Sequence, residues 1–223
     1  MGVPMTDRAA NVDSAVDSSV DSAVDSAVDS AVDSAVDSAV DSAVDSGETV
    51  AFIACGSNLG DRVDACLRAL RELNATPGIT VARVSRLIET APVGPVPQGP
   101  FINGVARLVT TLSAGALLAR CLEVEKTLGR VRGDEEVRWG PRAIDLDVLL
   151  FGDAVIHQPG LEVPHPQMHL RHFVLAPLAE IAPDTRHPVF GYSVARLLAE
   201  LGGPADYGAR PSRGLERAAG STP

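Results

Sequence analysis

Two aspartates at the head of an apolar run constrain this chain more than any other feature. Asp145 and Asp147 lie in the segment 143–151, whose alternating and aliphatic residues predict a β-strand. Side chains two positions apart on a strand share a face, so both carboxylates are expected on one side, opposite Leu146 and Val148. Two like charges so close repel each other, and hard cations such as Mg²⁺ relieve that repulsion. The pattern therefore predicts a metal site for phosphate groups.

The residues just before this strand supply positive charge. Four arginines lie within thirteen residues: Arg130, Arg132, Arg138 and Arg142. Their planar, permanently charged forks suit phosphate oxygens. The simpler alternative is a solvent-exposed face on which the arginines balance the negative charge of the acidic residues 134–136. Trp139 and the Gly-Pro that follows it have no role in such a face, so the combination favours a nucleotide polyphosphate site.

Five segments resemble, in order, the 6-hydroxymethyl-7,8-dihydropterin pyrophosphokinase family of folate biosynthesis. They are the opening strand and turn 52–60, the loop 90–94, the strand start 101–103, the signature 138–150, and the closing segment 163–166 with Arg171 and Phe173. Together they cover about residues 49 to 185. The resemblance implies an ATP-dependent diphosphotransferase that moves the β,γ-diphosphate of ATP to the pterin hydroxymethyl group and releases AMP.

The resemblance also implies a role for each matched residue. Catalytic roles go to Arg130, Arg142, Asp145 and Asp147, and the two aspartates would hold two Mg²⁺ ions. The pterin would lie against Thr90, Val93, Phe101, Asn103 and Phe173. The nucleotide would lie against Glu125, Arg132, Trp139, His165 and Arg171. For Glu125, a solvated charge on a helix surface remains the alternative. Departures from the family pattern at Leu122, Gly133 and Pro166 leave the adenine and phosphate contacts open.

The body of the chain alternates strand and helix. Strands are expected at 49–55, 79–89, 101–112 and 143–151, with one helix after a cap at Asn58 or Asp61 and another after Ser113. The order βαββαβ predicts an α+β, ferredoxin-like sandwich with two helices on one face. Gly152 and Asp153 predict a hairpin into 154–156, and two more helices are expected at 173–181 and 193–201.

The first part of the chain is a low-complexity repeat. From residue 12 to 47 the sequence repeats Val-Asp-Ser-Ala nine times, with small variations. On a helix this period drifts by about 40° per repeat and sets like charges at i and i+4, so no apolar face forms. We expect residues 1–48 to be a disordered tail, 49–202 the pyrophosphokinase domain, and 203–223 a second disordered tail. Ten Asp, one Glu and one Arg among the first 49 residues account for the net charge of −10.

Several other classes of protein are disfavoured. The only lysine, Lys126, follows Glu125 where a Walker A loop requires glycine, which excludes a P-loop kinase. No apolar stretch approaches the roughly 20 residues that span a membrane, and the N-terminus lacks the pattern of a signal peptide. His165, His169 and His172 lack a Cys or carboxylate at ligand spacing, so zinc is disfavoured.

The expected setting follows from the same features. Three cysteines among apolar neighbours, Cys55, Cys66 and Cys121, are expected to be buried free thiols in a reducing cytoplasm. We expect a cytoplasmic monomer with small-molecule substrates and without a nucleic-acid or membrane partner. Another Mg²⁺-dependent nucleotide transferase and a non-catalytic ferredoxin-like binding module remain the alternatives.

Overall fold

The computed structural model describes residues 47–130 and 140–203. The strands are β1 (Thr49–Ser57), β2 (Ile79–Val84), β3 (Ile88–Thr90), β4 (Phe101–Thr110), β5 (Asp145–Phe151), β6 (Ile156–Gln158) and β7 (Leu161–Val163). The helices are α3 (Arg62–Asn74), α4 (Ala114–Thr127), α5 (His172–Ile181) and α6 (Val194–Leu201), with a short 3₁₀ turn, η2, at Met168–Leu170. The predicted tail 1–48 and C-terminal tail 203–223 lie almost wholly outside the described residues.

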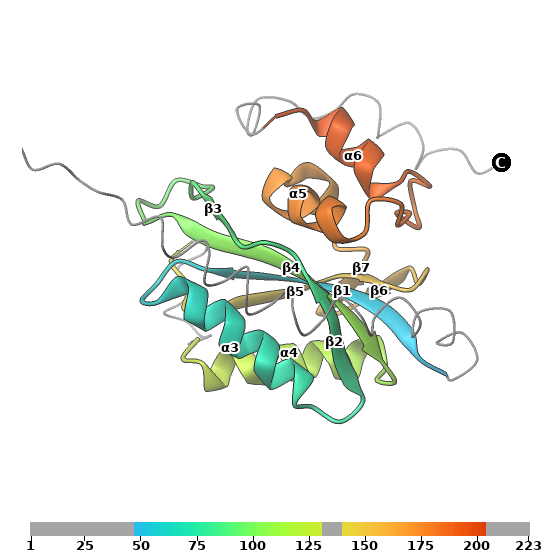
Figure 1. Cartoon of the computed structure of the whole chain (residues 1–223), viewed down its shortest axis with the longest axis horizontal. Coiled ribbons are helices and arrows are strands. Elements are labelled where there is room, and N and C mark those ends of the chain that lie inside the picture. Colours follow the sequence, from blue (N-terminus) through green and yellow to red (C-terminus); the bar gives the residue numbers. More distant parts are fainter. Residues whose placement is uncertain (1–46, 131–139, 204–223) are drawn as a thin grey trace, which may run out of the picture.

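The strands form one main sheet in the order β2-β4-β1-β5, and β3 continues the edge beside β4. Every pairing in it is antiparallel. Both helices of the predicted βαββαβ unit, α3 and α4, cover one face, whereas α5 and α6 lie over the other (Figure 1). The predicted α+β class and element order are therefore confirmed.

The face under α3 and α4 is sealed by small and aliphatic side chains. Ile53 of β1, Leu73 of α3 and Leu117 of α4 are fully buried in this core. Each helix begins at a side-chain cap. Asp61 accepts from the Asp64 backbone N–H at 3.0 Å, and Ser113 caps α4 in the same way. Such caps satisfy helix N–H groups that have no partner within the helix. The three cysteines are free and buried, as expected.

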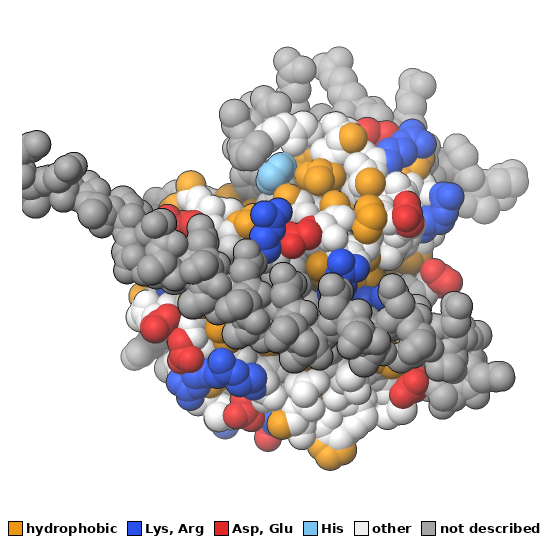
Figure 2. Space-filling model, viewed as in Figure 1, with side chains coloured by type: hydrophobic (Ala, Val, Ile, Leu, Met, Phe, Trp, Pro, Cys, Tyr) orange, Lys and Arg blue, Asp and Glu red, His pale blue; other side chains and the backbone are white. Residues whose placement is uncertain are grey.

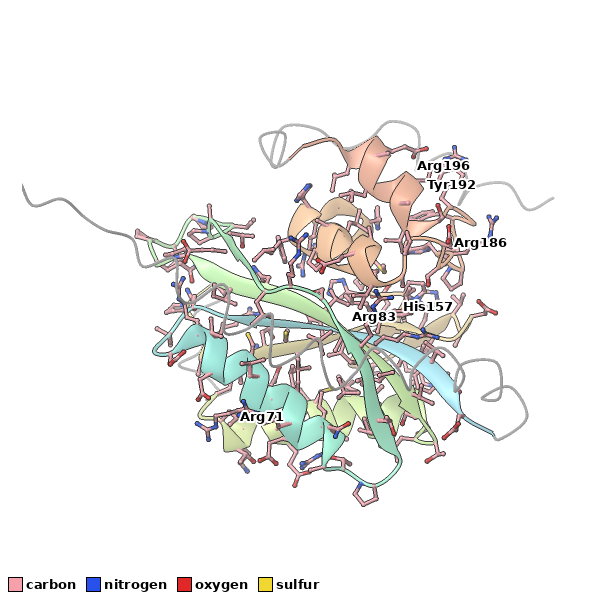
Figure 3. All side chains as sticks on the ribbon, in the orientation of Figure 1. Arg71, Arg83, His157, Arg186, Tyr192 and Arg196 are labelled. Carbon is pink, nitrogen blue, oxygen red and sulfur yellow. The ribbon has the colours of Figure 1, made fainter. Side chains whose placement is uncertain are left out.

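The opposite face has a smaller cover. Phe52, Leu175 and Leu178 belong to a second core between the sheet and the two C-terminal helices. On the outside of α6 the guanidinium of Arg196 lies over the ring of Tyr192, 3.6 Å from its centroid (Figure 3). These helices cover only part of the sheet, and the ends of β1, β4 and β5 near residues 57, 101 and 145 border a pocket.

Two local predictions are wrong. The segment 79–89 is not one regular strand, because the pairing with β4 shifts register between Val81 and Arg83. It divides into β2 and β3, with residues 85–87 outside both, and Ala82 is buried while Arg83 is exposed. The predicted hairpin at Gly152 is also wrong. The Gly152 N–H donates to the Val50 carbonyl at 2.7 Å, and β6 pairs with β7 instead.

The described surface carries both signs of charge. Acidic and basic side chains are interspersed on the face in Figure 2, with scattered apolar side chains between them. Among residues 47–130 and 140–203, no helix combines the length and the apolar character that crossing a membrane requires.

Candidate active site

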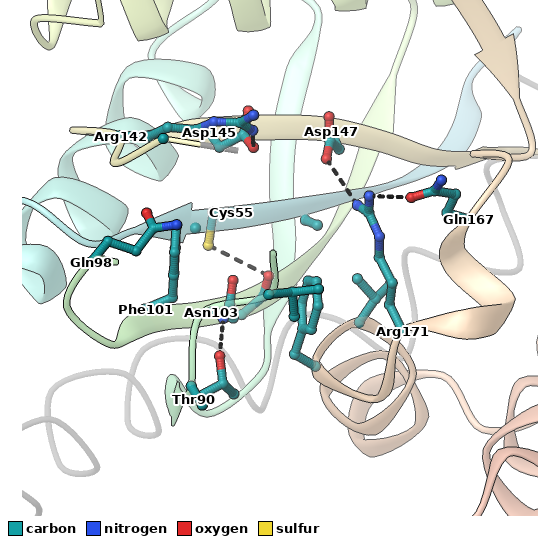
Figure 4. A pocket seen from close by; sticks show the side chains of 18 residues that line it. Cys55, Thr90, Gln98, Phe101, Asn103, Arg142, Asp145, Asp147, Gln167 and Arg171 are labelled. Carbon is teal, nitrogen blue, oxygen red and sulfur yellow. Dashed lines mark hydrogen bonds and ion pairs between the residues drawn. The ribbon is translucent and has the colours of Figure 1, made fainter. Parts of the chain in front are cut away.

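A pocket of about 190 Å³ lies where β1 ends and β5 begins, on the face that α5 partly covers (Figure 4). Its lining residues come from the neighbouring ends of β1, β4 and β5, the loop after β3 and the start of α5. Among them are Thr90, Val93, Gln98, Phe101, Asn103, Arg142, Asp145, Asp147, Gln167, Arg171 and Phe173. The pocket thus combines aromatic, amide, carboxylate and guanidinium groups.

The two predicted carboxylates lie side by side on β5. Asp145 is opposite Gly56 and Asp147 opposite Ala54 in the pairing with β1, and both line the pocket. Leu146 and Val148 lie in the core under the helices. The strand prediction and the sorting of side chains between its two faces are therefore confirmed.

Asp145 is held by two arginines. Arg130 and Arg142 each donate from Nη1 to a different oxygen of its carboxylate. Burial raises the pKa of Asp145, but the charges and hydrogen bonds of Arg142 and Arg130 outweigh it, and the pKa lies below its usual range. Asp145 is therefore ionised at neutral pH.

Asp147 has a different environment on the same strand. Its carboxylate is 37% exposed, with His165 Nε2 and Arg171 Nη1 each at 3.8 Å. Burial and the charge of Asp145 raise its pKa to about 6, although Arg171 lowers it. Burial and Arg171 lower the pKa of His165 to about 4, so its imidazole is neutral at pH 7 and forms no ion pair there. Two adjacent carboxylates that repel each other are a favourable donor set for a divalent cation.

Glu125 lies behind the pocket. Its side chain is fully buried, and its Oε1 accepts from Arg130 Nη1 at 2.8 Å and from the Leu146 backbone N–H at 2.7 Å. The alternative of a solvated helix charge is therefore wrong. Glu125 and Arg130 line neither the main pocket nor the second pocket beside it, so both act from beneath the β5 carboxylates. A buried charge needs such paired, hydrogen-bonded surroundings.

All five residues assigned to the pterin line the same pocket. Asn103, only 8% exposed, donates from Nδ2 to Thr90 Oγ1 at 2.7 Å. Thr90 and Phe101 are opposite each other in the β3–β4 pairing. Gly56 allows this packing, because a Cβ there would lie 2.8 Å from Asn103 Oδ1. Phe173 stands at the α5 side, with the Arg171 guanidinium 5.7 Å from its ring centroid.

A second pocket, of about 250 Å³, adjoins the first on the other side of Asp147. Its lining residues are Leu118, Asp147, Val148, Gln158, Gly160, Leu161, Glu162, His165 and Pro166. Sequence reasoning assigned only Asp147 and His165 of this set to the site. The apolar Leu161 and Val163 that flank Glu162 were the available signal for the short β6–β7 hairpin, and the hairpin was placed too early.

Three predictions lie outside the described residues. Arg132, Trp139 and the loop 131–137, which was expected to close over phosphates, belong to the segment 131–139. Of the fourteen residues assigned from the sequence, the structure brings ten into the two pockets and places Glu125 and Arg130 behind them.

The antiparallel sandwich, with paired carboxylates and arginines between two pockets, has the architecture of a phosphoryl-transfer enzyme. The chain belongs to the 7,8-dihydro-6-hydroxymethylpterin-pyrophosphokinase family, whose model matches residues 52–183. A Bacillus subtilis relative, 2-amino-4-hydroxy-6-hydroxymethyldihydropteridine pyrophosphokinase, is 47% identical over 132 residues, 59% of this chain and 77% of the relative. A Pseudomonas aeruginosa relative of the same name is 41% identical over 170 residues, 76% of this chain and 97% of the relative.

Solved structures share the fold at lower identity. The wild-type HPPK-DHPS of Plasmodium falciparum, crystallised with pteroate, superposes with a TM-score of 0.54 at 15% identity. The match covers 68% of this chain and 42% of that longer one. At this identity the likeness supports the fold alone.

Proposed function

We propose that the chain transfers the diphosphate of ATP to the hydroxymethyl group of 6-hydroxymethyl-7,8-dihydropterin, giving AMP and the pterin diphosphate for folate synthesis. One observation carries the proposal most directly. Asp147 borders both pockets, one with aromatic and amide groups and one lined by apolar and polar side chains alike. Two substrates bound on opposite sides of this carboxylate would bring their reacting ends together beside it.

The main pocket suits a flat, amide-edged ring. Phe101 from β4 and Phe173 from α5 both line it and offer aromatic rings. Aromatic stacking and the amide of Asn103 fit a pterin, whose edge carries both hydrogen-bond donors and acceptors. The bond to Thr90 holds that amide in one orientation.

The second pocket suits the nucleotide. Leu118, Val148 and Leu161 give it apolar walls, and His165 stands at its border with Asp147. A neutral His165 beside the cation of Arg171 offers a hydrogen-bonding ring without a second positive charge. Arg171 and Arg142 line the main pocket beside the two aspartates, within reach of a polyphosphate that bridges the pockets.

The carboxylates of Asp145 and Asp147 supply the oxygen ligands that Mg²⁺ prefers, and we propose that they would hold two ions. Both are carboxylates on one face of β5, and burial together with the charge of Asp145 raises the pKa of Asp147, an effect that a bound cation would oppose. When bound, Mg²⁺ would neutralise negative charge on the transferred diphosphate. The protein groups do the rest, because Arg142 keeps Asp145 ionised and the pocket walls align the pterin hydroxyl with the β-phosphorus. We further propose that the enzyme acts as a monomer in the cytoplasm.

The direct test is product formation. The protein is mixed with ATP, Mg²⁺ and the pterin alcohol, and AMP is followed by chromatography. AMP that appears only when the pterin is present supports the proposal. AMP that forms equally without the pterin would favour another nucleotide enzyme, and no AMP in either case would favour a binding module.

A further inference from the structure

The turn after β1 joins two sides of the main pocket through one side chain. Asn58 accepts from the Arg142 backbone N–H at 2.7 Å, and its own N–H donates to the Arg142 carbonyl at 3.0 Å. Its Nδ2 donates in the other direction, to Gln98 Oε1 at 2.9 Å and to the Gly99 carbonyl at 3.4 Å. One amide thus bridges two segments that lie more than 40 positions apart.

Asn58 is buried and does not cap the neighbouring helix. It is 8% exposed, and the helix that follows is capped by Asp61 rather than by Asn58. The neighbouring Ser57 supports the same junction, because its Oγ donates to the Ala143 carbonyl at 2.7 Å. A buried amide with both ends hydrogen-bonded is costly to remove and fixes the groups that it joins.

The two segments that Asn58 joins lie next to different parts of the proposed site. Gln98 and Gly99 lie three and two positions before Phe101 of the pterin slot. Arg142 lies on the other side, and its side chain pairs with Asp145. The place of the pterin loop, residues 91–100, and the place of the phosphate-facing arginine therefore depend on the same amide.

We infer that Asn58 is a positioning residue that couples the pterin loop to Arg142, an inference that rests on the proposed function. When the loop adopts the conformation that holds the pterin, the amide sets the backbone of Arg142 for phosphate contact. Misplacement of a positioned group by about 1 Å can cost on the order of a hundredfold in rate. Asn58 would thereby make the position of Arg142 for diphosphate transfer depend on whether the pterin slot is occupied.

The first test is Asn58→Ala, measured by steady-state kinetics with both substrates varied. We expect kcat to fall about tenfold or more and the KM for the pterin to rise, because both ends of the bridge are lost. The matched control is Asn74→Ala, which removes an asparagine that accepts from the Val81 N–H at 2.9 Å away from the pocket. A kcat for Asn58→Ala equal to that of Asn74→Ala would overturn the inference.

The second test is a double-mutant cycle with Arg142→Ala. If Asn58 acts through Arg142, then Asn58→Ala should lower kcat much less in the Arg142→Ala background than in the parent. If Asn58→Ala does not fold, the cycle is made between Gln98→Ala and Arg142→Ala, which leaves Asn58 in place. Non-additive losses support the coupling and additive losses overturn it. Pterin-dependent AMP formation by the parent tests the proposed function separately.

Discussion

The two faces of the sheet are covered for different purposes. Beneath α3 and α4, buried residues such as Leu117 and Ile53 fill the space completely. On the other face, α5 and α6 cover one part of the sheet and leave a charged pocket beside Asp145 and Asp147. Stability and chemistry are divided across the first half of one strand, because Leu146 and Val148 of β5 enter the core under α3 and α4 whereas Asp145 and Asp147 line the pocket.

The largest expected effect concerns the sealed face. Leu117→Ala should lower the free energy of unfolding by about 2 to 5 kcal/mol, because it leaves a cavity in a fully buried core. At a temperature where the variant is folded, kcat should be unchanged. Leu178→Ala, in α5, is the matched substitution on the other face, and it should also weaken pterin binding because α5 carries Phe173. Denaturant unfolding and kinetics together check both. Equal kinetic effects from the two variants would show that the two faces do not differ in this way.

The next effect concerns the open face. Asp147→Ala should lower kcat by about a hundredfold or more, a loss of roughly 2.7 kcal/mol of transition-state stabilisation, while the fold is retained. The control is Asp153→Ala, which removes an exposed aspartate just after the same strand. Turnover is measured in saturating Mg²⁺. Near-parent turnover of Asp147→Ala would refute the metal assignment.

A smaller effect is expected within the pterin slot. Asn103→Ala should weaken pterin binding by about 1 to 3 kcal/mol, because polar groups of the ring edge would be buried without partners. ATP affinity in the absence of the pterin should hardly change. Isothermal titration calorimetry with each ligand measures the two affinities. Unchanged pterin affinity would contradict the slot.

The raised pKa of Asp147 makes the open face sensitive to pH. A folded-state pKa of about 6, above the ordinary 3.8, means that the stability from binding a proton is present below pH 4 and is lost as the pH rises through 6. Asp147→Asn should therefore be more stable than the parent above pH 6 and no more stable below pH 4. Since the carboxylate is more than a third exposed, we expect about 1 kcal/mol or less. Metal-free thermal unfolding at pH 4 and pH 8 tests this, and a pH-independent difference would contradict it.

The smallest effect is expected from the repeat at the start of the chain. Deletion of residues 1–46 should leave thermal stability and kinetics essentially unchanged, because the repeat has no core-forming face. The opposing hypothesis is that its aspartates imitate ATP phosphate and compete for the site arginines. The KM for ATP, measured at low and moderate salt with and without the repeat, separates the two. A lower KM on deletion, with a difference that fades as salt rises, would support competition.

Regular patterns in the sequence predicted the parts of the site that depend on alternation. Asp145, Asp147 and their apolar neighbours are sorted correctly because a strand has a period of two. The resemblance placed Asn103 and Phe173 together across 70 positions, which local patterns cannot do. Burial of Glu125 could not be predicted, because a glutamate on a helix is read as exposed until its partner Arg130 is placed in three dimensions.

The local errors have physical causes as well. The register shift near Ala82 depends on pairing with β4, a long-range contact that a strand pattern does not record. The chain does turn at Gly152, where the Ala154 N–H donates to the Phe151 carbonyl, but β6 then pairs with β7 and not with β5. The junction at Asn58 was missed for a related reason. Its bonds to Gln98 and Arg142 connect segments whose proximity only the folded chain defines.

The contact between Gly56 and Asn103 has a consequence for inhibition. A side chain at position 56 would begin 2.8 Å from the Asn103 oxygen and would force the amide that we propose to contact the pterin to move. Consider a compound that packs against this stretch of β1. A substitution at Gly56 that blocked the compound would also be expected to weaken substrate binding. Resistance to such a compound would have to arise elsewhere, most readily in the exposed side chain of Val93 at the mouth of the pocket.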